Sequence, residues 1–142
     1  MNYIVIYTDG ACSKTTGGWG AVIIQEGKEI EISGKELDST NNRMELKAVI
    51  ESLKKIKNPS IIKIKTDSKY VVNAFNKKWI EKWKTNKWKT STNSDVKNKD
   101  LWEELLKESK KHMIKWQWVK GHGSDPYNIR ADELAVSARL EE

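Results

Sequence analysis

The sequence predicts an α/β fold built on one mixed β-sheet. Three observations lead to this prediction: an almost continuously apolar segment at residues 2–8, two β-prone runs within 18–36, and amphipathic helical patterns further along the chain. Two runs joined by a short turn pair as an antiparallel hairpin, whereas strands connected through helices run parallel. The sheet is therefore expected to contain both kinds of pairing.

The first half of the chain supplies a central strand, a hairpin and a helix. Residues 2–8 are typical of a strand buried on both faces. Within 18–36, the turn-forming Glu26-Gly27-Lys28 separates the two strands of the hairpin. A helix is expected over 42–57 and ends before Pro59. Its apolar stripe consists of Leu46, Val49, Ile50 and Leu53.

The second half alternates between short strands and helices. We expect strands at 60–66 and 114–119, and helices at 68–76, 100–111 and 128–140. Asp100 is the expected N-cap of the helix at 100–111, because Glu103 follows three residues later as in a capping box. The polar stretch 90–99 is expected to be a loop.

Length and composition indicate one compact unit. A chain of 142 residues suits a single domain spanning 1–142. No apolar run approaches the roughly 20 residues of a membrane span, and no secretory signal is recognisable at the N-terminus. The lone Cys12 excludes an internal disulfide framework and a multi-cysteine zinc cluster. We therefore expect a cytoplasmic monomer that does not bind membranes.

Positive charge is concentrated in one segment. The net charge is +6, and residues 77–99 alone carry eight lysines against Glu81 and Asp95. Three tryptophans, Trp79, Trp83 and Trp88, are interleaved with these lysines. The pattern predicts a surface that binds a polyanion. The alternative is a solvated lysine-rich helix whose tryptophans pack into the core.

Four acidic residues occupy positions where they could meet. Asp9 and Asp67 each follow a Thr at the end of an apolar segment, and active sites of such folds lie at the carboxyl ends of parallel strands. Glu45 and Asp132 lie at the edges of the buried stripes of their helices. Each acid also has a structural explanation alone: a turn for the aspartates at strand ends, a capping box with Asn42 for Glu45, and a helix N-terminus for Asp132.

Four converging carboxylates would repel one another unless a cation lay among them. Oxygen ligands without clustered Cys or His select hard ions such as Mg²⁺ or Mn²⁺. Such ions, held by carboxylates and a substrate phosphate, suit phosphodiester hydrolysis.

Two further residues are candidates for roles at this site. His122 lies between two glycines, where a flexible loop could bring an imidazole near a leaving group. A solvent-exposed side chain is its alternative. Cys12 is expected to pack near the site or to contact substrate.

Eight segments together resemble ribonuclease H of type 1, the family that hydrolyses the RNA strand of RNA/DNA hybrids. They are YTDGAC, GGWGAV, TNNRMEL, TDSKYV, WIEKWKTNKWKT, VKNKDLW, IKWQWVKGH and RADELA. They occur in the family's order and cover nearly the whole chain. The resemblance implies a ribonuclease H-like fold, with a five-stranded mixed sheet flanked by helices. It also maps the family's four metal-binding acids onto Asp9, Glu45, Asp67 and Asp132, and its mobile-loop histidine onto His122.

The resemblance implies substrate contacts as well. Asn41 and Asn42 match minor-groove contacts, Thr40 matches a residue that grips a DNA phosphate, and the basic segment matches a protrusion that contacts the DNA strand. The candidates in that segment are Trp79, Trp83, Lys84, Lys87, Trp88 and Lys89. The chain departs from many bacterial members in the shorter loop SKTTGG and in Ile129, where an acid is common.

The expected reaction uses two Mg²⁺ ions, with Mn²⁺ as a possible substitute, and leaves a 5′-phosphate and a 3′-hydroxyl. Two other classes of function compete with it: a non-catalytic nucleic-acid-binding module, and a nuclease of this fold that acts on another substrate. The four acids disfavour the first, and the basic segment together with NNRMEL disfavours the second.

Overall fold

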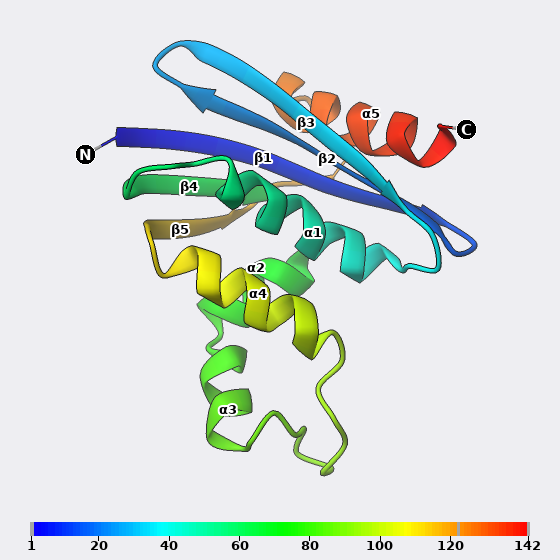
Figure 1. Cartoon of the computed structure of the whole chain (residues 1–142), viewed down its shortest axis with the longest axis vertical. Coiled ribbons are helices and arrows are strands. Elements are labelled where there is room, and N and C mark those ends of the chain that lie inside the picture. Colours follow the sequence, from blue (N-terminus) through cyan, green and yellow to red (C-terminus); the bar gives the residue numbers. More distant parts are fainter. Residues whose placement is uncertain (1, 122, 142) are drawn as a thin grey trace.

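A computed structural model describes residues 2–121 and 123–141, so His122 lies outside the described residues. The strands and helices along the chain (Figure 1) are β1 (Asn2–Ser13), β2 (Thr16–Gln25), β3 (Lys28–Glu36), α1 (Asn41–Lys54), β4 (Ser60–Thr66), α2 (Lys69–Asn76), α3 (Trp79–Thr85), α4 (Lys99–Ser109), β5 (Met113–Trp118) and α5 (Pro126–Leu140).

The strands form one five-stranded sheet in the order β3-β2-β1-β4-β5. The hairpin side is antiparallel, from β1 to β2 and from β2 to β3. The other side is parallel, from β1 to β4 and from β4 to β5. The predicted mixed α/β sheet is therefore confirmed.

Helices cover both faces of the central strand β1 (Figure 1). Ile4 and Ile6 are fully buried and pack with Leu46 of α1 on one face. Tyr7 points to the opposite face and packs with Val22 and with Ala131 of α5. Because alternate residues face alternate sides of a strand, burial on both sides explains why residues 2–8 are almost continuously apolar.

Glycines let α5 lie directly on β2. A Cβ added at Gly20 would lie 2.7 Å from the carbonyl oxygen of Ala131, and one added at Gly18 would lie 2.1 Å from that of Ala135. No side chain fits at either position. The segment GGWGAV thus fixes the depth at which α5, and with it Asp132, approaches the sheet.

The hairpin turn agrees with the sequence. Glu26 and Gly27 connect β2 to β3 and have φ values of 53° and 75°. Two consecutive left-handed residues in a two-residue loop match the right-handed twist of the paired strands.

At the starts of two helices, the structure has other N-cap residues than the candidates that the sequence offered. Thr40, and not Asn42, caps α1: its hydroxyl accepts a hydrogen bond from Arg43 N at 3.2 Å. This leaves the Glu45 side chain free of the capping role that the sequence allowed. Asp100 lies inside the first turn of α4, and Asn98 occupies the N-cap position without a side-chain cap.

One helix was expected only under the alternative explanation of the basic segment. Residues 77–98, called the protrusion below, contain α3 and a loop that extend away from the sheet (Figure 1). The spacing of Trp79 and Trp83 was the signal for it, since residues four apart share a helical face. Among residues 2–121 and 123–141, none of the helices has the length and apolar character needed to cross a bilayer.

Candidate active site

Asp9 lies where the pairing of β1 changes. The parallel ladder between β1 and β4 ends at Thr8 and Thr66, but β1 continues to Ser13, paired only with β2. Asp9 therefore lies within a strand and not at its end, which corrects the sequence-based expectation. Asp67 follows the last residue of β4, so both aspartates lie at the edge where the parallel strands stop.

Gly10 brings α1 against β1 beside Asp9. A Cβ added at Gly10 would lie 2.6 Å from Glu45 N and 2.7 Å from the Met44 carbonyl carbon. The absence of a side chain thus allows the first turns of α1 to touch the strand. This contact places the Glu45 side chain next to Asp9.

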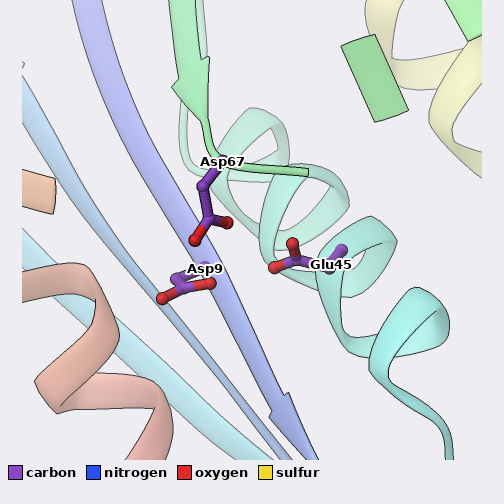
Figure 2. Close-up of side chains that lie close together, drawn as sticks. All are labelled: Asp9, Glu45 and Asp67. Atoms are coloured by element: carbon purple, nitrogen blue, oxygen red, sulfur yellow. The ribbon is translucent and has the colours of Figure 1, made fainter. Parts of the chain in front are cut away.

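Three carboxylates point toward one another (Figure 2). One oxygen from each of Asp9, Glu45 and Asp67 lies within 4.8 Å of the other two. Asp132 lines a cavity of about 280 Å³ together with Asp9 and Asp67. The fold thus gathers the four predicted acids from β1, α1, the end of β4 and α5.

Burial and mutual repulsion make the charged forms of these acids unfavourable. Asp9 is only 5% exposed, and burial, followed by the charge of Asp67, raises its pKa to about 8. The same two causes, burial first and then the charges of Asp9 and Asp67, raise the pKa of Glu45 well above its ordinary value. Gly10 N donates a hydrogen bond of 2.8 Å to Asp9 Oδ1, which opposes the shift only in part.

The residues fit a divalent cation. Glu45 Oε1 is buried and has no hydrogen-bond partner among the described residues, so it is an acceptor in need of a positive group. The three clustered ligands are all oxygens, which is the donor set of hard cations. A cation would supply the positive charge that this group of acids lacks.

Without metal, the free energy of unfolding is expected to fall as pH rises from about 4 to about 8. The folded state holds a proton on Asp9 up to about pH 8, whereas the unfolded chain releases it near pH 3.8, so folding binds protons in this window. Mg²⁺ should stabilise the protein more at the upper end of the window, because it competes with those protons.

Thermal unfolding with a chelator and with Mg²⁺, across this pH range, measures both effects. Asp9→Asn should flatten the pH dependence of the metal-free protein. Metal-free stability that rises steadily through the same window would contradict the assignment.

The loop after β5 packs on Asp67. A Cβ added at Gly121 would lie 2.6 Å from Asp67 Oδ2, and Trp118 Nε1 donates a hydrogen bond of 3.0 Å to the Asp67 carbonyl oxygen. Asn128 Nδ2 reaches back from α5 to the Lys120 carbonyl oxygen at 3.3 Å and lines the acidic cavity. Sequence reasoning missed Asn128, since an asparagine near a helix start ordinarily suggests only capping.

The candidate substrate contacts before α1 form one exposed group. Thr40, Asn41 and Asn42 are exposed at the N-terminus of the helix. Cys12 is half-buried beside them, with its Sγ 3.5 Å from the Ser39 carbonyl oxygen. Cys12 therefore borders the Thr40 segment and is absent from the lining of the acidic cavity.

The candidates in the protrusion divide between two sides. Trp79, Trp83 and Lys89 line a cavity of about 470 Å³, and Lys89 forms an ion pair with Asp95. Lys84 and Trp88 line a different hollow beside α4. All three tryptophans are half-buried against the core, so packing and surface roles coexist.

Among the residues of the larger cavity that were not predicted, Lys82 and Asn86 lie on or directly after α3. Their spacing was readable, since 79, 82, 83 and 86 follow the period of one helical face. Lys87 is exposed and lines neither hollow.

A mixed sheet with a carboxylate cluster where its parallel strands end defines an α/β protein with a site suited to a divalent cation. The RNase H family model matches residues 1–139. A protein named Ribonuclease H from Caldicellulosiruptor saccharolyticus is 52% identical over 139 residues, covering 96% of each chain. Another of that name from Caldanaerobacter subterraneus is 54% identical over 135 residues, covering 94% of this chain and 88% of its own.

A solved structure shares the fold. The crystal structure of LC9-RNase H1, described as a type 1 RNase H with the type 2 active-site motif, has a TM-score of 0.85 at 27% identity and covers 97% of this chain and 72% of its own. The chain belongs to the ribonuclease H family and is an enzyme of it, a nuclease of type 1.

Proposed function

We propose that this enzyme hydrolyses the RNA strand of RNA/DNA hybrids with two Mg²⁺ ions, leaving a 5′-phosphate and a 3′-hydroxyl. The observation that carries the proposal is the meeting of Asp9, Glu45 and Asp67 within 4.8 Å on a ribonuclease H frame. Asp132, in the same cavity, is the fourth proposed ligand. His122 is proposed, from the resemblance, to protonate the leaving group or to assist product release.

The four carboxylates would act together as ligands of the ions. One oxygen from each of Asp9, Glu45 and Asp67 lies within 4.8 Å of the other two, and Asp132 lines a cavity with Asp9 and Asp67. Bound divalent cations activate a water and stabilise the oxygen that leaves the phosphate. Because burial and neighbouring charges raise the pKa values of Asp9 and Glu45, metal binding to these acids would release protons.

Substrate choice would depend on surfaces outside the acidic cavity. The exposed amides of Asn41 and Asn42 are suited to the edges of bases and sugars in a minor groove. Recognition of the 2′-hydroxyl identifies the RNA strand. Thr40 and the lysines of the protrusion would contact phosphates, and such contacts position the duplex without reading its sequence.

Alanine at Lys82 and Lys89 is expected to weaken hybrid binding and to reduce the dependence of log affinity on log salt by roughly one unit per lysine. Both side chains line the cavity between the tryptophans of the protrusion. Binding titrations over a range of salt concentrations measure the slope. Lys115→Ala is the matched control, because Lys115 is exposed on β5, away from the protrusion. A slope equal to that of the native protein would remove the protrusion from the binding surface.

One cleavage assay tests the function itself. The enzyme is offered an RNA/DNA hybrid, double-stranded RNA and double-stranded DNA, each with Mg²⁺, with Mn²⁺ and with chelator. We expect cleavage of the hybrid alone, dependent on metal, with 5′-phosphate ends. Binding without cleavage would favour a non-catalytic module, and cleavage of double-stranded DNA would favour a different nuclease.

The proposal includes a cytoplasmic monomer with one catalytic domain over residues 1–142. A single cysteine suits a reducing compartment, and the family match runs through residues 1–139. Light scattering of the purified protein measures the oligomeric state.

A further inference from the structure

The two surfaces proposed to hold the hybrid belong to different parts of the chain. One is the N-terminal turn of α1 with Asn41 and Asn42, and the other is the protrusion. A duplex that touches both requires a fixed spacing between them. The inference below rests on the proposed function, because it concerns how these two surfaces are held together.

Arg43 joins the surfaces through a forked contact. It lies next to Asn42 on α1, and its guanidinium donates to both carboxylate oxygens of Asp100, from Nη1 to Oδ1 at 3.0 Å and from Nη2 to Oδ2 at 2.8 Å. Nη1 also donates to Asn98 Oδ1 at 3.2 Å. Asn98 and Asp100 lie where the chain returns from the protrusion into α4. Two parallel bonds fix direction as well as distance, which a single contact does not.

Further hydrogen bonds and aromatic contacts connect the Arg43–Asp100 pair to the protrusion. Asn98 Nδ2 donates to the Tyr70 hydroxyl at 3.1 Å, and Trp102 Nε1 donates to the same hydroxyl at 2.9 Å. The ring of Trp102 is fully buried and packs on that of Trp83, with 5.5 Å between centroids. A continuous series of contacts therefore runs from the first turn of α1 to the aromatic face of α3.

The backbone at both ends of the protrusion is unusual. Lys78 and Asn98 have φ values of 59° and 63°, in the left-handed region that non-glycine residues seldom adopt. The surroundings must hold such residues in place. At Asn98, the side-chain bonds to Arg43 and Tyr70 supply that restraint.

We propose that Arg43 and Asp100 are positioning residues that hold the protrusion at the spacing from Asn41 and Asn42 that an RNA/DNA hybrid requires. They act on substrate affinity and not on the chemical step, because neither lines the acidic cavity. The pair lies at the surface, with side-chain exposures of 32% for Arg43 and 65% for Asp100, so its loss leaves the core intact.

The direction in which hybrid affinity changes when Asp100 is neutralised separates this role from simple electrostatics. Asp100 is a negative charge on a protein that binds a polyanion, so its neutralisation alone would strengthen binding. If the carboxylate holds the protrusion in place, its neutralisation weakens binding instead. Arg43→Lys offers a second comparison, since it keeps the charge and removes the fork.

The experiment compares Asp100→Asn and Arg43→Lys with Glu103→Gln. Glu103 lies on the same helix, and its contact with Lys99 is long at 4.0 Å, so Glu103→Gln removes an equal charge without breaking the fork. We expect Asp100→Asn and Arg43→Lys to raise KM for the hybrid about fivefold, with kcat within about twofold of the native value. Glu103→Gln should leave KM unchanged or lower it. Hydrogen exchange of residues 86–98 should accelerate in the first two variants only.

Failure of the inference is distinct from failure of the proposed function. If the native enzyme cleaves the hybrid and Asp100→Asn binds it as tightly or more tightly, the positioning role is wrong. Equal loss of kcat and of affinity in Asp100→Asn would also overturn it, because the chemistry would then be disturbed. If the native enzyme does not cleave the hybrid in Mg²⁺, the function itself is wrong.

Discussion

Asp9→Asn is expected to reduce the rate of hybrid hydrolysis about a thousandfold or more, because bound divalent ions lower the activation barrier by several kcal/mol and each 1.4 kcal/mol changes the rate about tenfold. The pKa of Asp9 is influenced by all three other acids: by the charge of Asp67 and by the side chains of Asp132 and Glu45. Asparagine has the same shape and can still accept the hydrogen bond from Gly10 N through its Oδ1. The substitution therefore removes charge and leaves the packing unchanged.

Two measurements separate loss of metal from loss of fold. Calorimetric titration with Mg²⁺ should show weaker binding to Asp9→Asn. The metal-free variant should be at least as stable as the native protein, because the replaced carboxylate is buried beside like charges.

Glu133→Gln serves as the matched control. Glu133 lies on α5 next to Asp132 in sequence, but its side chain is exposed and forms only a 3.9 Å contact with Arg130. The activity of the Glu133→Gln variant should remain within about twofold of that of the native enzyme, because surface substitutions usually have small effects. Hydrolysis by Asp9→Asn at the native rate would rule out the carboxylate cluster as the metal site.

The sheet was predictable because local pattern and tertiary burial agree in this chain. Continuous apolar character marked the central β1, and the sequence around Gly27 marked the hairpin turn. Helix α1 begins at Asn41, one residue before the predicted start. The sequence could not settle this, because Thr40, Asn41 and Asn42 are all good capping residues and the tertiary structure determines which of them is the N-cap.

The cluster of acids was only partly readable from local sequence. The pairing of β1 continues beyond Asp9 because β2 extends further along β1 than β4 does. The extent of this pairing depends on the partner strands and cannot be predicted from the sequence of β1 alone. For Glu45, local sequence left a cap and a ligand equally open. The choice depends on the close approach at Gly10, a contact between residues distant in sequence.

Gly10→Ala is expected to cost about 2 kcal/mol of unfolding free energy and to lower kcat about a hundredfold. The new Cβ would meet Glu45 N at 2.6 Å and the Met44 carbonyl carbon at 2.7 Å, both of which are backbone atoms. Backbone in a helix cannot rotate away as a side chain can. The N-terminal turns of α1 must therefore move by about 1 Å to restore ordinary contact distances, and Glu45 moves with them.

Gly10→Ala is expected to lower both stability and kcat because the contact of Gly10 with α1 affects both. The approach of α1 to β1 packs the core, and it also sets the distance from Glu45 to Asp9. Urea unfolding measures the first effect, and hybrid cleavage under Mg²⁺ saturation measures the second. Gly27→Asn is the control for replacing a glycine, because Gly27 has open space around it and asparagine tolerates its left-handed φ of 75°. If Gly10→Ala lost stability but kept its full kcat, the proposed link between this contact and the position of Glu45 at the metal site would be wrong.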